Sequence, residues 1–164
     1  MKNLYLIGGT MGVGKTTVCR MLKKKMEKAV FLDGDWCWDA DPFVVTDETK
    51  KMVMENIAFL LGAFLRVSAY ENIVFCWVMH EKSIIDDILS RLNTENVRVH
   101  AVSLTADEES LKERLLKDIK DGIREGDIVE RSVKRLPLYN NLGTVKIDTS
   151  GKTVSEIAEE IMRI

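Results

Sequence analysis

Short apolar runs alternate along the chain with longer segments in which apolar residues recur every three or four positions. The short runs predict strands at 4–8, 30–33, 73–79, 97–104 and 145–148. The longer segments predict helices at 16–27, 47–68, 82–92, 107–120 and 153–162. The run IVFCWVM is apolar on both faces, as a parallel strand covered by helices on each side requires. The alternation therefore predicts an α/β fold in three layers, with a doubly wound parallel sheet in the middle.

Two segments lack this periodicity, and ligand sites in such sheets lie where loops leave the carboxyl ends of strands. The first, GDWCWDADPFVVT, ends at Thr46, which is placed to cap the next helix, and we expect an acceptor-side region at 34–66. The second, at 121–137, is rich in charge and contains glycines. We expect it to form a mobile lid within a single domain that spans residues 1–164.

Composition and charge narrow the possible partners. The 24 basic and 26 acidic residues are mixed along the chain, which disfavours a nucleic-acid-binding surface. The three cysteines form neither a disulfide framework nor a CxxC pair, as expected of free thiols in a reducing compartment. The apolar run at the N-terminus is too short for a signal peptide or a membrane span. We expect a cytoplasmic protein, monomeric or homodimeric, that does not bind membranes.

A phosphate-binding loop follows the first predicted strand and opens the first predicted helix. The motif G-x-x-x-x-G-K-[ST] is matched in full by Gly9, Thr10, Met11, Gly12, Val13, Gly14, Lys15 and Thr16, with Thr17 next. Its backbone N–H groups and the helix dipole would hold phosphates of ATP. Lys15 would reach the β- and γ-phosphate oxygens, and the Thr16 hydroxyl would ligate Mg²⁺. The loop leaves the acceptor open, whether water, a nucleotide, a sugar, an antibiotic or a protein switch.

Two carboxylates follow the second predicted strand, at the same sheet edge as the phosphate loop. Asp33 and Asp35 are separated by Gly34, and Asp-Gly turns are common without any function. Phosphoryl transfer to a hydroxyl needs Mg²⁺ near the γ-phosphate and gains from a carboxylate that orients the acceptor. Their place beside the phosphate loop favours the functional interpretation.

At this point the chain resembles the P-loop small-molecule kinases of the nucleoside monophosphate kinase-like group, which includes shikimate, gluconate and adenylate kinases. The resemblance rests on GTMGVGKTT, on LDGD and on the ending IDTSGKTVSEIAEEI, and it spans nearly the whole chain. It implies the strand order 2-3-1-4-5. It also implies that Asp33 lies near Mg²⁺ and that Asp35 binds the acceptor hydroxyl.

The same resemblance implies roles for arginines and for the last loop. Arg114 would be the arginine of the helix that leads to the lid, and Arg124, Arg131 and Arg135 lie in the lid itself. Arg114 and Arg124 are the first candidates for phosphate contacts, although a single arginine is more often a solvated surface residue. The adenine edge would lie beside Ser150, Gly151 and Lys152, which otherwise form an ordinary turn into a capped helix.

Departures from the group concern the acceptor. The chain has Trp77-Val78-Met79-His80 after the third strand, where shikimate kinase is rich in glycine. No arginine lies between Trp36 and Leu65, whereas adenylate kinase brings several to its acceptor phosphate. A neutral or amphipathic small molecule is therefore favoured over a nucleoside monophosphate, and Trp36 and Trp38 are candidates to stack on a ring. His80 is placed to face the acceptor, but a lone histidine is more often a neutral hydrogen-bonded group.

The sequence thus predicts an ATP- and Mg²⁺-dependent small-molecule kinase with Lys15, Asp33, Asp35, Arg114 and Arg124 as catalytic residues. Thr16 and Asp33 are the predicted metal-site residues. Candidate acceptors are a nucleoside or nucleotide, a sugar acid, or an aminoglycoside-like or phenicol-like antibiotic. The alternatives are a nucleotide-binding regulator or ATPase without an acceptor and, less favoured by the charge, a nucleic acid end kinase.

Overall fold

The computed structural model describes residues 1–124 and 126–164, and its strands form one parallel sheet. The strands are β1 (Lys2–Gly8), β2 (Ala29–Asp33), β3 (Asn72–Cys76), β4 (Val97–Thr105) and β5 (Val145–Asp148). Their order in the sheet is β2-β3-β1-β4-β5. The predicted fold class and strand order are therefore confirmed.

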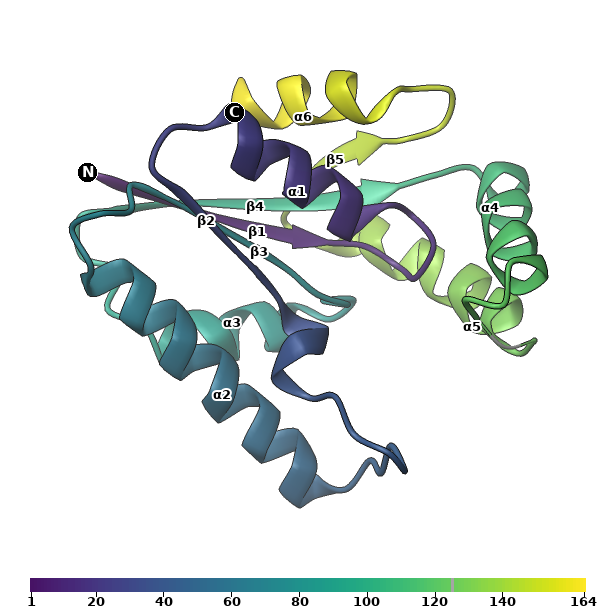
Figure 1. Cartoon of the computed structure of the whole chain (residues 1–164), viewed down its shortest axis with the longest axis horizontal. Coiled ribbons are helices and arrows are strands. Elements are labelled where there is room, and N and C mark those ends of the chain that lie inside the picture. The colour runs from purple at the N-terminus through teal and green to yellow at the C-terminus, as the bar shows by residue number, and fades with distance from the viewer. Residues whose placement is uncertain (125) are drawn as a thin grey trace.

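Helices cover both faces of this sheet. They are α1 (Lys15–Lys25), α2 (Asp47–Arg66), α3 (Lys82–Ser90), α4 (Glu108–Lys120), α5 (Ile128–Arg135) and α6 (Val154–Met162), with short 3-10 helices η1 (Gly34–Cys37) and η2 (Leu136–Asn141). Helices α1 and α6 lie on one face and α2 and α3 on the other, while α4 and α5 extend past the carboxyl ends of the central strands (Figure 1). None of the helices in the described part of the chain is both long and apolar enough to cross a membrane.

The central strand β1 is apolar from Leu4 to Ile7 because both of its faces are buried there. Successive side chains of a strand point to opposite faces of the sheet. Tyr5 and Ile7 belong to the core packed against α1 and α6, whereas Leu4 and Leu6 belong to the core packed against α2 and α3. Burial on both faces excludes charged side chains between Leu4 and Ile7, and the phosphate loop begins just after this buried run.

One predicted strand and one predicted loop differ from the structure by more than two residues, whereas the other predicted elements agree with it to within two residues at each end. The strand predicted at 73–79 ends at Cys76, because its neighbour β1 ends one residue after their last registered pair, Ile7 with Cys76. Trp77, Val78 and Met79 therefore leave the sheet. The segment predicted as an irregular lid at 121–137 contains α5 and the start of η2, while residue 125 within it lies outside the described residues.

The predicted cap of α2 is confirmed. The Thr46 side chain accepts a hydrogen bond from the backbone N–H of Thr49 at 3.2 Å. In turn, the Thr49 hydroxyl oxygen accepts one from the backbone N–H of Thr46 at 2.8 Å. Such reciprocal bonds satisfy donors that a helix start would otherwise leave without partners. The cap fixes where the long loop after β2 ends and α2 begins.

Candidate functional site

The loop between β1 and α1 has the backbone that phosphate binding requires. Gly9, Gly12 and Gly14 have φ values of 152°, 82° and 100°, in the region that favours glycine. Gly14 is the N-cap of α1 and offers no capping side chain, and the first turn contains no acidic residue. The first N–H groups of α1 are thus available to an anion, and the helix dipole favours negative charge there.

Close packing also excludes side chains from this loop. A Cβ at Gly12 would lie 2.5 Å from Leu115 Cδ2, and one at Gly9 would lie 2.9 Å from the backbone oxygen of Leu104. Leu115 belongs to α4 and is fully buried. Helix α4 therefore packs directly on the phosphate loop and brings its own polar side chains to the same site.

The Lys15 side chain bonds to the backbone at the start of its own loop. Its Nζ donates hydrogen bonds to the carbonyl oxygens of Gly9 at 2.7 Å and Thr10 at 3.0 Å. Burial lowers the pKa of Lys15, while the nearby carboxylates of Asp33 and Asp35 act in the opposite direction. The ammonium thus lies in a partly desolvated position, where an additional negative charge would stabilise it.

Asp33 and Thr16 form the second part of the site. The Thr16 hydroxyl donates a 2.7 Å hydrogen bond to Asp33 Oδ2. The other carboxylate oxygen, Oδ1, accepts the backbone N–H of Asp35 at 3.1 Å and caps η1. Mg²⁺ commonly takes one or two protein oxygens and completes its shell with water and substrate phosphate. This hydroxyl and carboxylate pair fits such an ion.

Asp35 lies in η1, just after β2, and lines the cavity around the phosphate loop. The residue is exposed, but nearby protein atoms still bury part of its carboxylate. This burial raises the pKa of Asp35, the neighbouring Asp33 charge raises it further, and Lys15 and the Trp77 side chain oppose the shift. Asp35 is therefore a more basic carboxylate than an ordinary surface aspartate.

These residues line one cavity of about 740 Å³. The predicted residues in its wall are Met11, Gly12, Gly14, Lys15, Thr16, Thr17, Asp33, Asp35, Arg114 and Arg124. Lys117, Asp118 and Asp121 also line it and were missed, although they follow Arg114 at helical spacing on one face of α4. Arg124 Nε donates to Asp118 Oδ2 at 2.9 Å, so α4 holds this arginine in the cavity wall. We refer to this space as the phosphate cavity.

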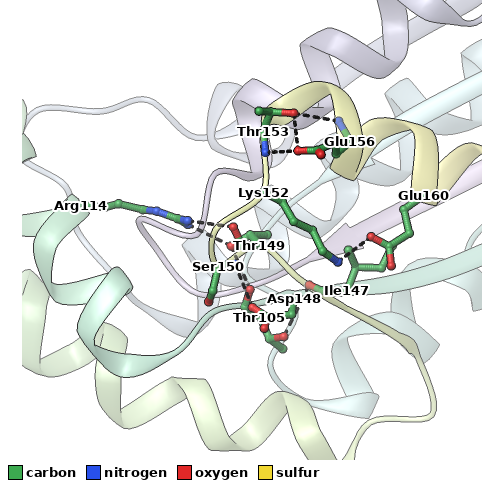
Figure 2. A network of polar contacts seen from close by, with 10 residues as sticks. All are labelled: Thr105, Arg114, Ile147, Asp148, Thr149, Ser150, Lys152, Thr153, Glu156 and Glu160. Atoms are coloured by element: carbon green, nitrogen blue, oxygen red, sulfur yellow. Dashed lines mark hydrogen bonds and ion pairs between the residues drawn. The ribbon is translucent and has the colours of Figure 1, made fainter.

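Arg114 links the phosphate loop to the last strand (Figure 2). Its Nη1 donates to Thr149 Oγ1 at 2.9 Å and its Nη2 donates to the Thr149 carbonyl oxygen at 3.0 Å. Nη1 also lies 3.4 Å from the carbonyl oxygen of Val13. The guanidinium is thus held in a fixed orientation at the edge of the phosphate cavity.

The predicted adenine-side residues form a structured turn. Ser150 Oγ accepts the backbone N–H of Asp107 at 2.8 Å. Lys152 Nζ pairs with Glu160 at 2.8 Å, as Figure 2 shows. Val154, just after this turn, lines the phosphate cavity, but residues 150–152 are not part of its wall in the described chain. The cavity wall, as far as the structure describes it, also does not include Gly9, Thr10 and Val13, which belong to the phosphate loop itself.

A second cavity of about 590 Å³ adjoins the first, and Val78 lines both. Its walls come from the loop after η1, from α2, from residues 77–80, from α3 and from Arg135 at the end of α5. Trp38 and Phe43 form one side, with ring centroids 4.4 Å apart, and Trp77 lies in the wall near Val78. We call this space the apolar cavity.

The two tryptophans of the predicted acceptor loop have different positions. Trp38 lines the apolar cavity, whereas Trp36 is 55% exposed and packs edge-on against Phe31. His80 also lines this cavity, with Nε2 3.4 Å from Glu81 Oε1. Its buried Nδ1 has no hydrogen-bond partner among the residues that the structure describes.

Comparison with known proteins agrees with this geometry. The AAA_18 family, described as an AAA domain, matches residues 6–133. A shikimate kinase from Francisella philomiragia is 30% identical over 98% of this chain and 92% of its own length. The chain belongs to the P-loop small-molecule kinases of the nucleoside monophosphate kinase-like type. The family resemblance drawn from the sequence is therefore confirmed.

Solved structures share the fold of this kinase at lower identity. A tunicamycin resistance protein from Deinococcus radiodurans is 21% identical with a TM-score of 0.76, covering 99% of this chain and 95% of its own. A gluconokinase from Sinorhizobium meliloti is 18% identical with a TM-score of 0.72, covering 98% and 90%. The names of these proteins refer to different small molecules, so the shared fold leaves the acceptor of this kinase open.

Proposed function

We propose that this kinase transfers the γ-phosphoryl group of ATP, with Mg²⁺, to a hydroxyl or phosphate of a small molecule. The observation that carries the proposal is the adjacency of two cavities at Val78, one built around the phosphate loop and one beside it. A nucleotide-binding regulator needs only the first cavity. A phosphotransferase needs a second place, next to the γ-phosphate, where an acceptor can be oriented.

Each polar group of the phosphate cavity has a task in this proposal. The N–H groups at the start of α1 bind phosphate oxygens, and Lys15 exchanges the carbonyls of Gly9 and Thr10 for the β- and γ-phosphates. Thr16 and Asp33 hold the Mg²⁺ ion, directly or through water. When bound, this ion would neutralise charge on the transferred group. Arg114 and Arg124 supply further positive charge at the same wall.

Asp35 orients the acceptor in this proposal. Its raised pKa makes the carboxylate a better hydrogen-bond acceptor and base for a substrate hydroxyl than an ordinary aspartate. It lines the phosphate cavity, while the neighbouring Trp77 lines the apolar cavity. A hydroxyl at the junction of the cavities would meet Asp35 on one side and the phosphate loop on the other.

The experiment compares ADP release from MgATP with and without candidate acceptors drawn from nucleosides, sugar acids, aminoglycosides and phenicols. We expect one class to raise ADP release at least about tenfold, since kinases restrict water at the γ-phosphate until the acceptor is bound. Fast ADP release that no acceptor changes would favour the alternative of an ATPase or nucleotide-binding regulator.

A further inference from the structure

The apolar cavity carries information about the acceptor that the phosphate cavity does not. Most of its wall is apolar, with Trp38, Phe43, Val53, Met54, Trp77 and Ile84 contributed by four separate segments of the chain. Its volume of about 590 Å³ lies within the range of small-molecule sites. A cavity of this size and character is suited to an organic molecule that buries much apolar surface.

On the basis of the proposed phosphotransferase function, we infer that the acceptor is an amphipathic alcohol. Its apolar, ring-bearing body would occupy the apolar cavity, and its hydroxyl would project toward Asp35. Polyhydroxylated acids such as gluconate and shikimate would be poor acceptors. This assigns a substrate class to a site whose relatives carry the names of polar substrates.

The aromatic walls argue against a polyol. Trp38 and Phe43 pack together with their ring planes tilted by 37° to one another, and both aromatic side chains line the cavity. A hydroxyl buried against such surface loses its bonds to water without replacing them, which costs free energy for each group buried. A flat apolar ring makes no hydrogen bonds to water that it could lose, and it gains free energy from stacking on the aromatic side chains.

Part of the polar wall is already engaged within the protein. Asp87 accepts a 2.8 Å hydrogen bond from Arg91 Nε, and Lys50 lies 3.6 Å from Asp47. These contacts engage two of the charged side chains of the cavity, while His80, Ser83 and Arg135 make up the rest of its polar wall. The polar residues are the smaller part of the wall, and two of them are already paired within the protein.

Trp77 connects the apolar body to the reacting end. A Cβ at Gly34 would lie 2.5 Å from Trp77 Cγ, so the indole rests directly on the turn that carries Asp35. A ring packed against Trp77 is consequently held next to this carboxylate. Val78 follows and lines both cavities, so the two cavities meet at the residue next to Trp77.

The test measures ADP release from the full-length protein with MgATP and two pairs of probes. The apolar alcohols are 4-nitrobenzyl alcohol and 3-phenyl-1-propanol, and the polyols are gluconate and shikimate. We expect the apolar alcohols to stimulate ADP release about tenfold or more, and the polyols less than about twofold. Stimulation by the polyols alone would overturn the inference while upholding the proposed function. Absence of stimulation by all four, with MgATP bound, would overturn the inference, and the wider panel of acceptors would then decide the proposed function.

Two tryptophan variants locate the effect. Trp38→Ala removes a wall of the apolar cavity, and we expect it to raise the KM for the apolar alcohols about tenfold without changing the KM for ATP. Trp36→Ala is the matched control from the same 3-10 turn region, because Trp36 packs on Phe31 outside this cavity. Equal effects of the two variants on the alcohol KM would show that the apolar cavity does not bind the acceptor.

Discussion

The Thr16 hydroxyl donates to Asp33 Oδ2 at 2.7 Å and joins the first turn of α1 to the end of β2. Asp33 is thereby occupied on both oxygens, since Oδ1 accepts the N–H of Asp35. Asp35 has no such contact to the phosphate loop and is turned to the cavity. Two carboxylates that are separated by one residue are thus placed for different tasks.

Asp33→Asn is expected to weaken the response to Mg²⁺. An amide attracts a hydrated cation less than a carboxylate does. Only one of its two terminal atoms is an oxygen, so it cannot accept both the Thr16 hydroxyl and the Asp35 N–H as the two carboxylate oxygens do. We expect kcat/KM to fall by the equivalent of about 2–4 kcal/mol, with partial recovery at high Mg²⁺. Titration of activity against Mg²⁺ measures this. A normal Mg²⁺ requirement would rule out the assigned role of Asp33.

Asp35→Asn is expected to impair use of the acceptor rather than the response to Mg²⁺. It removes a charge-assisted bond to the acceptor, so the acceptor KM should rise and kcat should fall while the affinity for MgATP stays near that of the wild type. Steady-state kinetics with both substrates, run beside Asp33→Asn, separates the two roles. Indistinguishable kinetic profiles for the two variants would contradict the division between them.

The difference in stability between Asp35→Asn and the wild type should depend on pH. Burial and the Asp33 charge raise the pKa of Asp35 in the folded state, so its stabilising contribution is present below the ordinary aspartate pKa of about 3.9 and is lost as pH rises through the folded value. At neutral pH the ionised Asp35 therefore costs stability. We expect Asp35→Asn to melt at a higher temperature than the wild type at pH 7, with a smaller difference at pH near 4. A lower Tm at pH 7 would contradict this.

The phosphate cavity was largely predictable because a local motif and one topological rule define it. The motif fixes residues 9–16, and the carboxyl ends of parallel strands meet at one edge, which brings Asp33 to Thr16. The apolar cavity was not predictable in this way. Its walls combine Trp38, Trp77 and Ile84 from segments far apart in the chain, and Trp77 was itself assigned to a strand because it continues an apolar run.

Helix α5 was missed for a different physical reason. Two of its buried residues, Ile128 and Ser132, are four positions apart, but serine does not register in an apolar pattern. Ser132 is buried against the phosphate loop, where its carbonyl oxygen accepts the Thr10 hydroxyl at 3.0 Å, a contact across more than a hundred residues of sequence. The expectation that 121–137 moves as a lid stays a prediction.

Lys15→Met should abolish phosphoryl transfer and leave the fold intact. Burial already disfavours the charged form of Lys15, as its lowered pKa indicates, and methionine fills a similar volume without that charge. We expect activity to fall at least about a thousandfold and ATP binding to weaken. Lys25→Met, in the last turn of the same helix and paired with Glu159 instead, is the matched control for both activity and Tm. Retained turnover in Lys15→Met would end this account of the loop.

Gly34→Ala tests the contact between the Asp35 turn and Trp77. The new Cβ would lie 2.5 Å from Trp77 Cγ, so the indole must shift, which should destabilise the fold by about 1–3 kcal/mol and raise the acceptor KM. Gly143→Ala is the control, because its Cβ would have no atom within 4 Å, and its stability should stay within about 0.5 kcal/mol of the wild type. Denaturant unfolding and acceptor kinetics are the measurements. Unchanged acceptor KM in Gly34→Ala would separate Trp77 from acceptor binding.

The most direct measurement of the proposed function is ³¹P NMR of the kinase with MgATP and an amphipathic alcohol. Transfer to the alcohol predicts a new phosphomonoester resonance that grows in step with ADP, with little inorganic phosphate, and that is absent with Lys15→Met. ADP accompanied only by inorganic phosphate, at a rate that no small-molecule acceptor changes, would contradict phosphoryl transfer and identify the chain as an ATPase.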